Sequence, residues 1–260
     1  MTSEAIPAAT ILLLRDKPDL QALMIERHAD MKFAGGALVF PGGRIELTDQ
    51  DPAWVDYVCG DYPVDQAAPR VGAIREAFEE TGILLARRKG ERDFIGDNDV
   101  LKLSKHRKAV EDDDQLFLEL IRQEGLVLAC DALVLYARWL PPEDVTHRRY
   151  FTWFFAALAP GNQTAREDGN EATDVVWVSP RSVVKEAQPT KKRMIFPTMR
   201  NVELLSVSQT AQEVLDFAQE RKIETVQPKL IERGNVKYIS IPDGLGYPII
   251  EERLDKAIRK

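Results

Sequence analysis

Three glutamates, Glu76, Glu79 and Glu80, lie within a stretch of nine residues that begins at Arg75. Residues three and four positions apart share one side of an α-helix, so these carboxylates would gather on one face. Hard cations such as Mg²⁺ and Mn²⁺ bind oxygen ligands and bridge to substrate phosphates. Arg75 can pair with one carboxylate and fix its rotamer, and Gly82 allows the left-handed residue at which a helix ends. The pattern predicts a metal-binding helix, and the alternative is an acidic surface helix capped by glycine.

A glycine-rich segment, Phe40-Pro41-Gly42-Gly43-Arg44-Ile45-Glu46, precedes these glutamates and is followed by Asp49. Glycine lacks a Cβ, so the backbone at Gly42 and Gly43 can come close to a polyphosphate. We therefore expect these two glycines to bind substrate in a loop before the helix, and the alternative is an ordinary turn.

Together, the two segments resemble the Nudix box, in which a glycine, five residues, an acid and a spacer lead to Arg-Glu-x-x-Glu-Glu-x-Gly. Gly43 and Asp49 have the spacing of its first half, and residues 75–82 match its second half. The family usually has Glu at the position of Asp49 and a spacer of seven residues. Here the spacer runs from Gln50 to Ile74, which is 25 residues. Whether Asp49 takes the role of the usual Glu is left open.

The resemblance implies an α/β fold, the Nudix α/β/α sandwich with a mixed β-sheet, and a catalytic centre that holds Mg²⁺ or Mn²⁺. The metal ligands that it implies are Glu76, Glu79 and Glu80. The catalytic residues that it implies are Glu79, Glu80, Arg75 and Glu171. In this family an acid near the last strand of the sheet often serves as a further ligand or as the general base. Glu171 is the best match, with Glu167 and Asp174 as alternatives, and which carboxylate acts as the base is left open.

A second pattern precedes the glycine-rich segment. Arg27, Lys32, Gly36 and Phe40 have the spacing of a signature that resembles the one before the box in coenzyme A diphosphatases. His28 replaces a small residue of that signature, and Lys32 replaces an Arg, whose bidentate fork a Lys lacks. The resemblance implies that Arg27 and Lys32 bind substrate phosphates, and the alternative for Arg27 is that it merely ends a strand.

Arg149, at the start of an aromatic segment that ends at Leu158, is a further candidate for binding a substrate phosphate. The interrupted box, a helical insertion and the C-terminal tail together resemble the mammalian peroxisomal acyl-CoA diphosphatase branch of the family. The chain ends in Ile258-Arg259-Lys260, which is not a peroxisomal tripeptide. We therefore expect a cytoplasmic protein.

The pattern of apolar and polar segments predicts the domain organisation. We expect a Nudix domain over residues 5–190 and a C-terminal α/β extension over residues 191–260 that packs on it. An irregular, acidic insertion at about 50–69 is interpreted either as a wall of the pocket or as a neutral surface excursion. A helical insertion at about 97–125 carries a basic cluster, which is typical of a solvated face. The box helix is predicted at about 71–85, with a buried face made of Ala73, Ile74, Ala77 and Phe78.

The composition limits the partners. Hydrophobic residues make up 44% and charged residues 30% of the chain, which is typical of a soluble globular protein. A net charge of −7 argues against an extended nucleic-acid surface, and no apolar run is long enough for a membrane helix. We expect a small-molecule diphosphate as the partner, with no nucleic acid and no membrane, and a homodimer is left open.

One function is expected from these observations, with two alternatives. The resemblance implies metal-dependent hydrolysis of the diphosphate bond in coenzyme A or acyl-CoA, with 3′,5′-ADP and (acyl)phosphopantetheine as products. The first alternative is a Nudix pyrophosphatase for ADP-ribose, NADH or another nucleoside diphosphate derivative, since the metal chemistry would be the same. The second is a non-catalytic, nucleotide-binding Nudix module, and the presence of all three glutamates counts against it.

Overall fold

The computed structural model describes residues 4–29, 35–142, 149–169, 172–185 and 193–257. The strands are β1 (Ile6–Asp16), β2 (Leu20–Arg27), β3 (Leu38–Val39), β4 (Gly42–Arg44), β5 (Ala86–Arg88), β6 (Leu126–Leu128), β7 (Val134–Trp139), β8 (Tyr150–Leu158), β9 (Ala172–Val178), β10 (Thr225–Val226), β11 (Lys229–Arg233), β12 (Val236–Ser240) and β13 (Glu251–Arg253). The helices are α1 (Ala67–Thr81), α2 (Asp97–Ser104), α3 (Arg107–Asp112), α4 (Gln115–Gln123), α5 (Pro180–Lys185), α6 (Phe196–Leu205), α7 (Ala211–Glu220) and α8 (Leu254–Ala257). Short 3₁₀ helices cover Thr48–Gln50, Pro52–Asp56, Val64–Gln66 and Cys130–Ala132.

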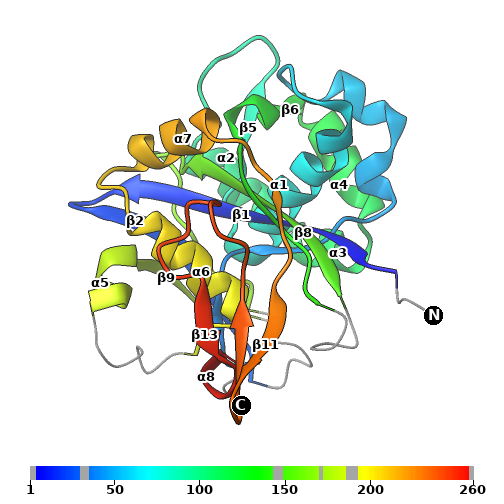
Figure 1. Cartoon of the computed structure of the whole chain (residues 1–260). Helices are drawn as coiled ribbons and strands as arrows, with labels where there is room; N and C mark the ends of the chain where they lie inside the picture. Colours follow the sequence, from blue (N-terminus) through cyan, green and yellow to red (C-terminus); the bar gives the residue numbers. More distant parts are fainter. Residues whose placement is uncertain (1–3, 30–34, 143–148, 170–171, 186–192, 258–260) are drawn as a thin grey trace.

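Strand β1 lies inside the main sheet and is buried on both faces (Figure 1). Side chains alternate across a strand, and here Ile11 and Leu13 enter one hydrophobic core while Leu12 and Leu14 enter the other. Strand β8 pairs with β1 in parallel and β2 pairs with it antiparallel, so the sheet is mixed. The order along the sheet is β10-β7-β8-β1-β2-β3, with β4 beside β1 and β9 beside β2.

Helices cover both faces of this sheet. Helix α1 and the helices α2 to α4 contribute to the first core, and α6 and α7 contribute to the second (Figure 1). This arrangement is the α/β/α sandwich with a mixed sheet that the family resemblance predicted, because a strand that is apolar on both sides needs a helical layer on each. None of the helices in the described residues combines the length and the apolar character that crossing a bilayer requires.

Helix α1 begins and ends four residues before the predicted bounds. Pro69 lies in the first turn of α1. The N–H groups of a first turn have no acceptor within the helix, so a proline there costs no hydrogen bond and the helix can begin before it. Gly82 has the predicted left-handed conformation, with a φ of 68°, and its N–H donates to the Phe78 carbonyl at 3.0 Å. The predicted face is fully buried and consists of Ala73, Ile74, Ala77 and Phe78.

The two insertions pack on α1. The helical insertion consists of α2, α3 and α4, and Phe117 of α4 stacks on Phe78 of α1 with ring centroids 6.1 Å apart. Trp54, from the insertion at 50–69, is buried with its ring centroid 5.7 Å from that of Phe117. Its indole N–H donates to the Thr48 carbonyl at 2.9 Å. The insertion at 50–69 therefore contributes a core residue, so it is not a neutral surface excursion.

Residues 193–257 pack on the second core. Strand β10 pairs in parallel with β7 at the edge of the main sheet, and β11, β12 and β13 form a separate three-stranded sheet. The indole N–H of Trp139, on β7, donates to the Tyr247 hydroxyl at 2.9 Å, and this hydroxyl donates to Asn201 Oδ1 at 3.0 Å. This buried chain of hydrogen bonds joins the sheet to α6 and to the segment before β13.

Replacing Tyr247 by Phe removes the hydroxyl at the centre of this chain, so the Trp139 indole N–H loses its acceptor and Asn201 Oδ1 loses its donor. An unsatisfied buried polar group costs about 1–3 kcal/mol, so we expect the free energy of unfolding of Tyr247→Phe to fall by a similar amount. Urea unfolding followed by circular dichroism measures this change. Tyr238→Phe removes the hydroxyl of a half-buried tyrosine on β12 and is the matched control. Equal losses in the two variants would contradict the stabilising role of the Tyr247 hydroxyl.

Candidate active site

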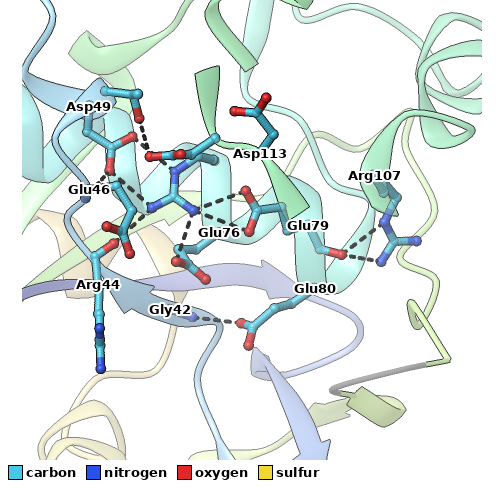
Figure 2. A network of polar contacts seen from close by, with 12 residues as sticks. Gly42, Arg44, Glu46, Asp49, Glu76, Glu79, Glu80, Arg107 and Asp113 are labelled. Carbon is cyan, nitrogen blue, oxygen red and sulfur yellow. Dashed lines mark hydrogen bonds and ion pairs between the residues drawn. The ribbon is translucent and has the colours of Figure 1, made fainter. Parts of the chain in front are cut away.

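The guanidinium of Arg75, on α1, contacts three carboxylates (Figure 2). Its Nε and Nη2 donate to the two oxygens of Asp49, each at 3.0 Å. Its Nη1 donates to Glu76 at 3.1 Å and to both oxygens of Glu79 at 3.0 and 3.2 Å. Nη2 also donates to the Arg44 carbonyl at 2.8 Å. Arg75 is only 3% exposed, Asp49 and Glu79 are buried as well, and Glu76 is half-buried. We call Arg75, Asp49, Glu76 and Glu79 the Arg75 cluster.

Asp49 reaches Arg75 from the 3₁₀ turn Thr48–Gln50. The Glu46 N–H donates to Asp49 Oδ2 at 2.9 Å and orients the carboxylate. The turn lies close against α1, since a Cβ added at Gly72 would stand only 2.9 Å from Asp49 Oδ2. The Asp that replaces the usual Glu of the box therefore forms a buried, bidentate ion pair with Arg75.

When Asp49, Glu76 and Glu79 are all ionised, three negative charges of the Arg75 cluster face the one positive charge of Arg75. Burial raises the pKa of Glu76 to about 8 and that of Glu79 to about 7, although Arg75 lowers both values. The charge of Asp49 contributes to both of these increases in pKa, and that of Glu111 contributes at Glu79. Ionised carboxylates are unfavourable in a buried site unless positive charge compensates them. The cluster can therefore accept an additional cation.

Glu80 turns away from this cluster toward β4 (Figure 2). The Gly42 N–H donates to Glu80 Oε2 at 2.8 Å, and Nη1 of Arg27 lies 3.8 Å from Glu80 Oε1. Gly42 and Gly43 belong to strand β4, which pairs with β1, so the predictions of a loop or a turn are wrong here. A Cβ at Gly42 would lie 2.6 Å from a Cα of β1, and a Cβ at Gly43 would overlap the Glu76 carboxylate. At Gly42 only a residue without a Cβ allows β4 to approach β1 so closely, whereas at Gly43 a Cβ would displace the Glu76 carboxylate.

Glu76, Glu79 and Glu80 offer the oxygen donors that Mg²⁺ and Mn²⁺ prefer. Glu76 and Glu79 turn to Arg75 and Glu80 turns to Gly42. As arranged, no three Asp, Glu, His or Cys side chains in the described part of the chain are grouped to hold an ion. A divalent cation would supply the positive charge that the ionised forms of Glu76 and Glu79 lack, so the residues fit the ion in donor type and in charge.

A cavity of about 1040 Å³ opens beside these side chains. The predicted site residues that line it are Arg27, Gly42, Gly43, Arg75, Glu76, Glu79 and Glu80. Arg149 does not line the cavity. It lies just before β8, and its Nε donates to the Pro141 carbonyl at 2.9 Å. Lys32 and Glu171 lie outside the described residues.

The wall next to the carboxylates comes from the helical insertion. None of residues 50–69 lines the cavity, so the interpretation of that insertion as a wall is wrong. Its Trp54 points into the core instead. The lining residues on this side are Val110, Glu111 and Asp112 of α3, followed by Asp114.

Arg107 belongs to the basic cluster of the helical insertion, yet its guanidinium is buried. Its Nε and Nη2 donate to the Glu79 carbonyl at 3.0 and 2.7 Å, and its Nη1 donates to the Glu167 carbonyl at 3.2 Å. It thereby caps the last turn of α1, whose carbonyls lack helical partners. The prediction of a solvated face is wrong for this residue. Its distance of three residues from the apolar Val110, which lies on the same helix α3, is that of a shared helix face, and this spacing was the available signal.

Among the described acids that precede or begin β9, Asp168 lines the cavity, and sequence reasoning did not select it. Its Oδ1 accepts a hydrogen bond from the Ala172 N–H at 2.9 Å. Glu167 contributes its carbonyl to Arg107, and Asp174 is exposed on β9. The acidic run before β9 was visible in the sequence, but which acid turns inward was not.

The family model described as the NUDT19 Nudix domain matches residues 59–205, which is 147 of the 260 residues. The chain belongs to the Nudix family. This Nudix chain is 24% identical over 246 residues to the acyl-coenzyme A diphosphatase NUDT19 of Xenopus laevis. The alignment covers 79% of this chain and 65% of that protein. It is 25% identical over 272 residues to the protein of the same name from Gallus gallus, and that alignment covers 84% of this chain and 72% of the Gallus gallus protein.

A putative nudix hydrolase 7 of Caenorhabditis elegans is 27% identical over 199 residues, with 76% of this chain and 60% of that protein covered. The chain thus spans less than two thirds of the length of the Xenopus laevis and Caenorhabditis elegans proteins. A crystal structure of a Nudix hydrolase from Alicyclobacillus acidocaldarius superimposes with a TM-score of 0.67 at 24% identity, over 83% of this chain and 97% of that one. This likeness supports the Nudix fold.

Asp49→Ala removes the bidentate partner of a buried guanidinium in this Nudix domain. Breaking a buried ion pair from one side costs about 3–5 kcal/mol. Glu76 and Glu79 stay beside Arg75, so we expect a loss at the lower end of that range in the free energy of unfolding, measured with denaturant. Asp51→Ala is the control, since the exposed Asp51 only caps the next 3₁₀ helix by accepting from the Ala53 N–H. A loss no larger than that of the control would show that Asp49 does not anchor Arg75.

Proposed function

We propose that this Nudix protein hydrolyses the diphosphate bond of coenzyme A or acyl-CoA, giving 3′,5′-ADP and (acyl)phosphopantetheine. The observation that carries the proposal is that Glu76, Glu79 and Glu80 line one cavity of about 1040 Å³, which is large enough for a nucleotide-sized ligand. The name acyl-coenzyme A diphosphatase belongs to the relatives from Xenopus laevis and Gallus gallus. The spacing of Arg27 and Gly36 before the box supports the same class of substrate.

Glu76, Glu79 and Glu80 would hold Mg²⁺ or Mn²⁺. When bound, the ion supplies positive charge for the diphosphate and makes water easier to deprotonate. Glu79 and Glu80 are the candidates for the general base that accepts a proton from the attacking water. Asp168 lines the same cavity and is a third candidate.

The remaining groups of the site position these carboxylates. Arg75 orients Glu76 and Glu79 through charge-assisted hydrogen bonds, and the Gly42 N–H orients Glu80. Arg27 stands beside Glu80 and adds a positive charge at the end of the cavity where the phosphates would bind. The arrangement suits phosphoryl chemistry, in which positioning and charge stabilisation account for most of the rate enhancement.

A substrate panel with Mg²⁺ or Mn²⁺ separates this function from its alternatives. The panel contains coenzyme A, acetyl-CoA, ADP-ribose and NADH, and chromatography identifies the phosphate-ester products. We expect the highest kcat/KM for a coenzyme A compound. A higher value for ADP-ribose or NADH would support the general nucleotide pyrophosphatase. Nucleotide binding without hydrolysis of any compound would support the non-catalytic module.

Glu80→Gln keeps the size of the side chain and removes the charge that a divalent ion requires. We expect kcat to fall by about two orders of magnitude or more, similar to the loss of a group that stabilises charge in a transition state. Glu119→Gln, at an exposed position on α4, is the control for removing a carboxylate and should leave kcat unchanged. Turnover of Glu80→Gln near that of the wild type at saturating Mg²⁺ would remove Glu80 from the proposed ligands.

Coenzyme A carries a 3′-phosphate that ADP-ribose and NADH lack, and its recognition requires a cation away from the diphosphate. Arg27 contacts Glu80, whereas Arg193 is an exposed residue of the cavity lining whose carbonyl accepts from the Leu38 N–H of β3. A charge-assisted hydrogen bond contributes about 1.5–3 kcal/mol. We therefore expect coenzyme A to exceed 3′-dephospho-coenzyme A roughly ten- to hundredfold in kcat/KM. Arg193→Ala should narrow this gap, and Arg27→Ala should weaken both substrates alike.

The measurement is kcat/KM for both compounds at one Mg²⁺ concentration. Arg122→Ala, which removes an exposed arginine of α4 outside the cavity, controls for the change in net charge. If the wild type prefers 3′-dephospho-coenzyme A, the assignment of coenzyme A as substrate is wrong. If the gap persists in Arg193→Ala, another cation binds the 3′-phosphate.

A further inference from the structure

The last turn of α1 carries Glu79 and Glu80, and some of the carbonyl groups there have no N–H partner within the helix. The N–H of Ile83 would be the helical partner of the Glu79 carbonyl, but it donates to the Thr81 hydroxyl at 3.2 Å. The guanidinium of Arg107 binds this carbonyl instead, through Nε at 3.0 Å and Nη2 at 2.7 Å (Figure 2). A side chain of the helical insertion therefore completes the end of α1.

The same guanidinium also reaches the segment that precedes β9. Its Nη1 donates to the Glu167 carbonyl at 3.2 Å, and the next residue, Asp168, lines the cavity. This segment lies against α1, since the Arg166 N–H donates to the Thr81 carbonyl at 2.8 Å. Arg107 therefore joins two segments that both bring carboxylates to the cavity.

Arg107 is buried behind the site and does not line the cavity, so it acts on the site only through the groups that it holds. Its three donating N–H groups belong to one rigid, planar guanidinium, which fixes how far apart the two carbonyls lie and how they are oriented. The side chains of a catalytic site have to be held within about 0.5 Å of their working geometry. The link through Arg107 supplies such a constraint between the end of α1 and the segment before β9.

From these contacts we infer that Arg107 is a positioning residue for the hydrolysis, because it holds together the two segments that present Glu79, Glu80 and Asp168 to the cavity. The inference rests on the proposed function, in which these carboxylates bind the metal or accept the proton. It gives the helical insertion, which supplies Arg107 from α3, a part in catalysis. A residue of this kind affects the rate of the chemical step more than the binding of the substrate.

Arg107→Met keeps the aliphatic stem of the side chain and removes its donors. A misplacement of about 1 Å can lower a rate about a hundredfold. We therefore expect kcat for the best substrate of the panel to fall about ten- to hundredfold, with KM changed less than about threefold. Arg107→Lys keeps the positive charge and one donating group, so it should recover part of the lost kcat. A kcat of Arg107→Met equal to that of the wild type would overturn the inference.

Arg70→Met is the matched control for a role in stability alone. Arg70 is likewise buried, and its Nη1 donates to the carbonyls of Cys130 and Leu133, so it also ties α1 to another segment. It lies in the first turns of α1 and does not line the cavity. Its loss should lower the midpoint of denaturant unfolding about as much as the loss of Arg107, because each leaves two backbone carbonyls without their donor, and it should leave kcat unchanged.

Equal losses of kcat in the two variants would reduce Arg107 to a stabilising residue and overturn the inference. If thermal unfolding shows that Arg107→Met does not fold, Arg107→Lys and Arg70→Lys give the same comparison with milder substitutions. In that pair, kcat should fall in Arg107→Lys and stay unchanged in Arg70→Lys.

Hydrogen exchange followed by mass spectrometry separates failure of this inference from failure of the proposed function. In Arg107→Met, the amides at the end of α1 and in residues 163–168 should exchange about tenfold faster, whereas Arg70→Met should leave them unchanged. This pattern, in a wild-type protein that hydrolyses no diphosphate compound, would retain the link between the two segments and remove the proposed function. Hydrolysis by the wild type with unchanged exchange in Arg107→Met would retain the proposed function and overturn the inference.

Discussion

The buried ion pair between Arg75 and Asp49 is the interaction on which the rest of the site depends. The two residues are 26 positions apart, and Asp49 stands before the interruption in the box while Arg75 stands after it. Closing a loop of 25 residues rather than seven costs only about 1 kcal/mol more in chain entropy, because that cost grows with the logarithm of the length. Leaving a buried guanidinium without its partner costs several times as much. The interrupted box therefore comes together as a continuous one would.

The same guanidinium sets the electrostatics of the site. Arg75 neutralises only part of the charge of Asp49, Glu76 and Glu79, and burial leaves the remainder poorly compensated. A site of this kind suits a cation, because added positive charge would stabilise the ionised carboxylates. Glu80 is held separately by β4, so the carboxylates stand on two sides of a single helix turn, one side facing Arg75 and the other facing Arg27.

The segments added to the Nudix sandwich do different work around this centre. The insertion at 50–69 contributes Trp54 to the core, and the helical insertion contributes Arg107, which holds the Glu79 carbonyl at the end of α1. The C-terminal part contributes further residues to the lining of the cavity, most of them apolar. The lining therefore comes from segments far apart in the chain, which the fold brings to one cavity.

Local patterns in the sequence determined the elements and the family. The glutamates at helical spacing, the glycine that ends α1 and the apolar residues on both sides of β1 depend on neighbours a few positions away, so they can be read without knowledge of the fold. The tertiary structure decided which side chains meet. It placed Arg27 beside Glu80, turned Arg149 to the Pro141 carbonyl and brought Asp168 to the cavity. Those outcomes depend on the packing of segments that are tens of residues apart, and no spacing along the chain encodes the direction in which a side chain points after that packing.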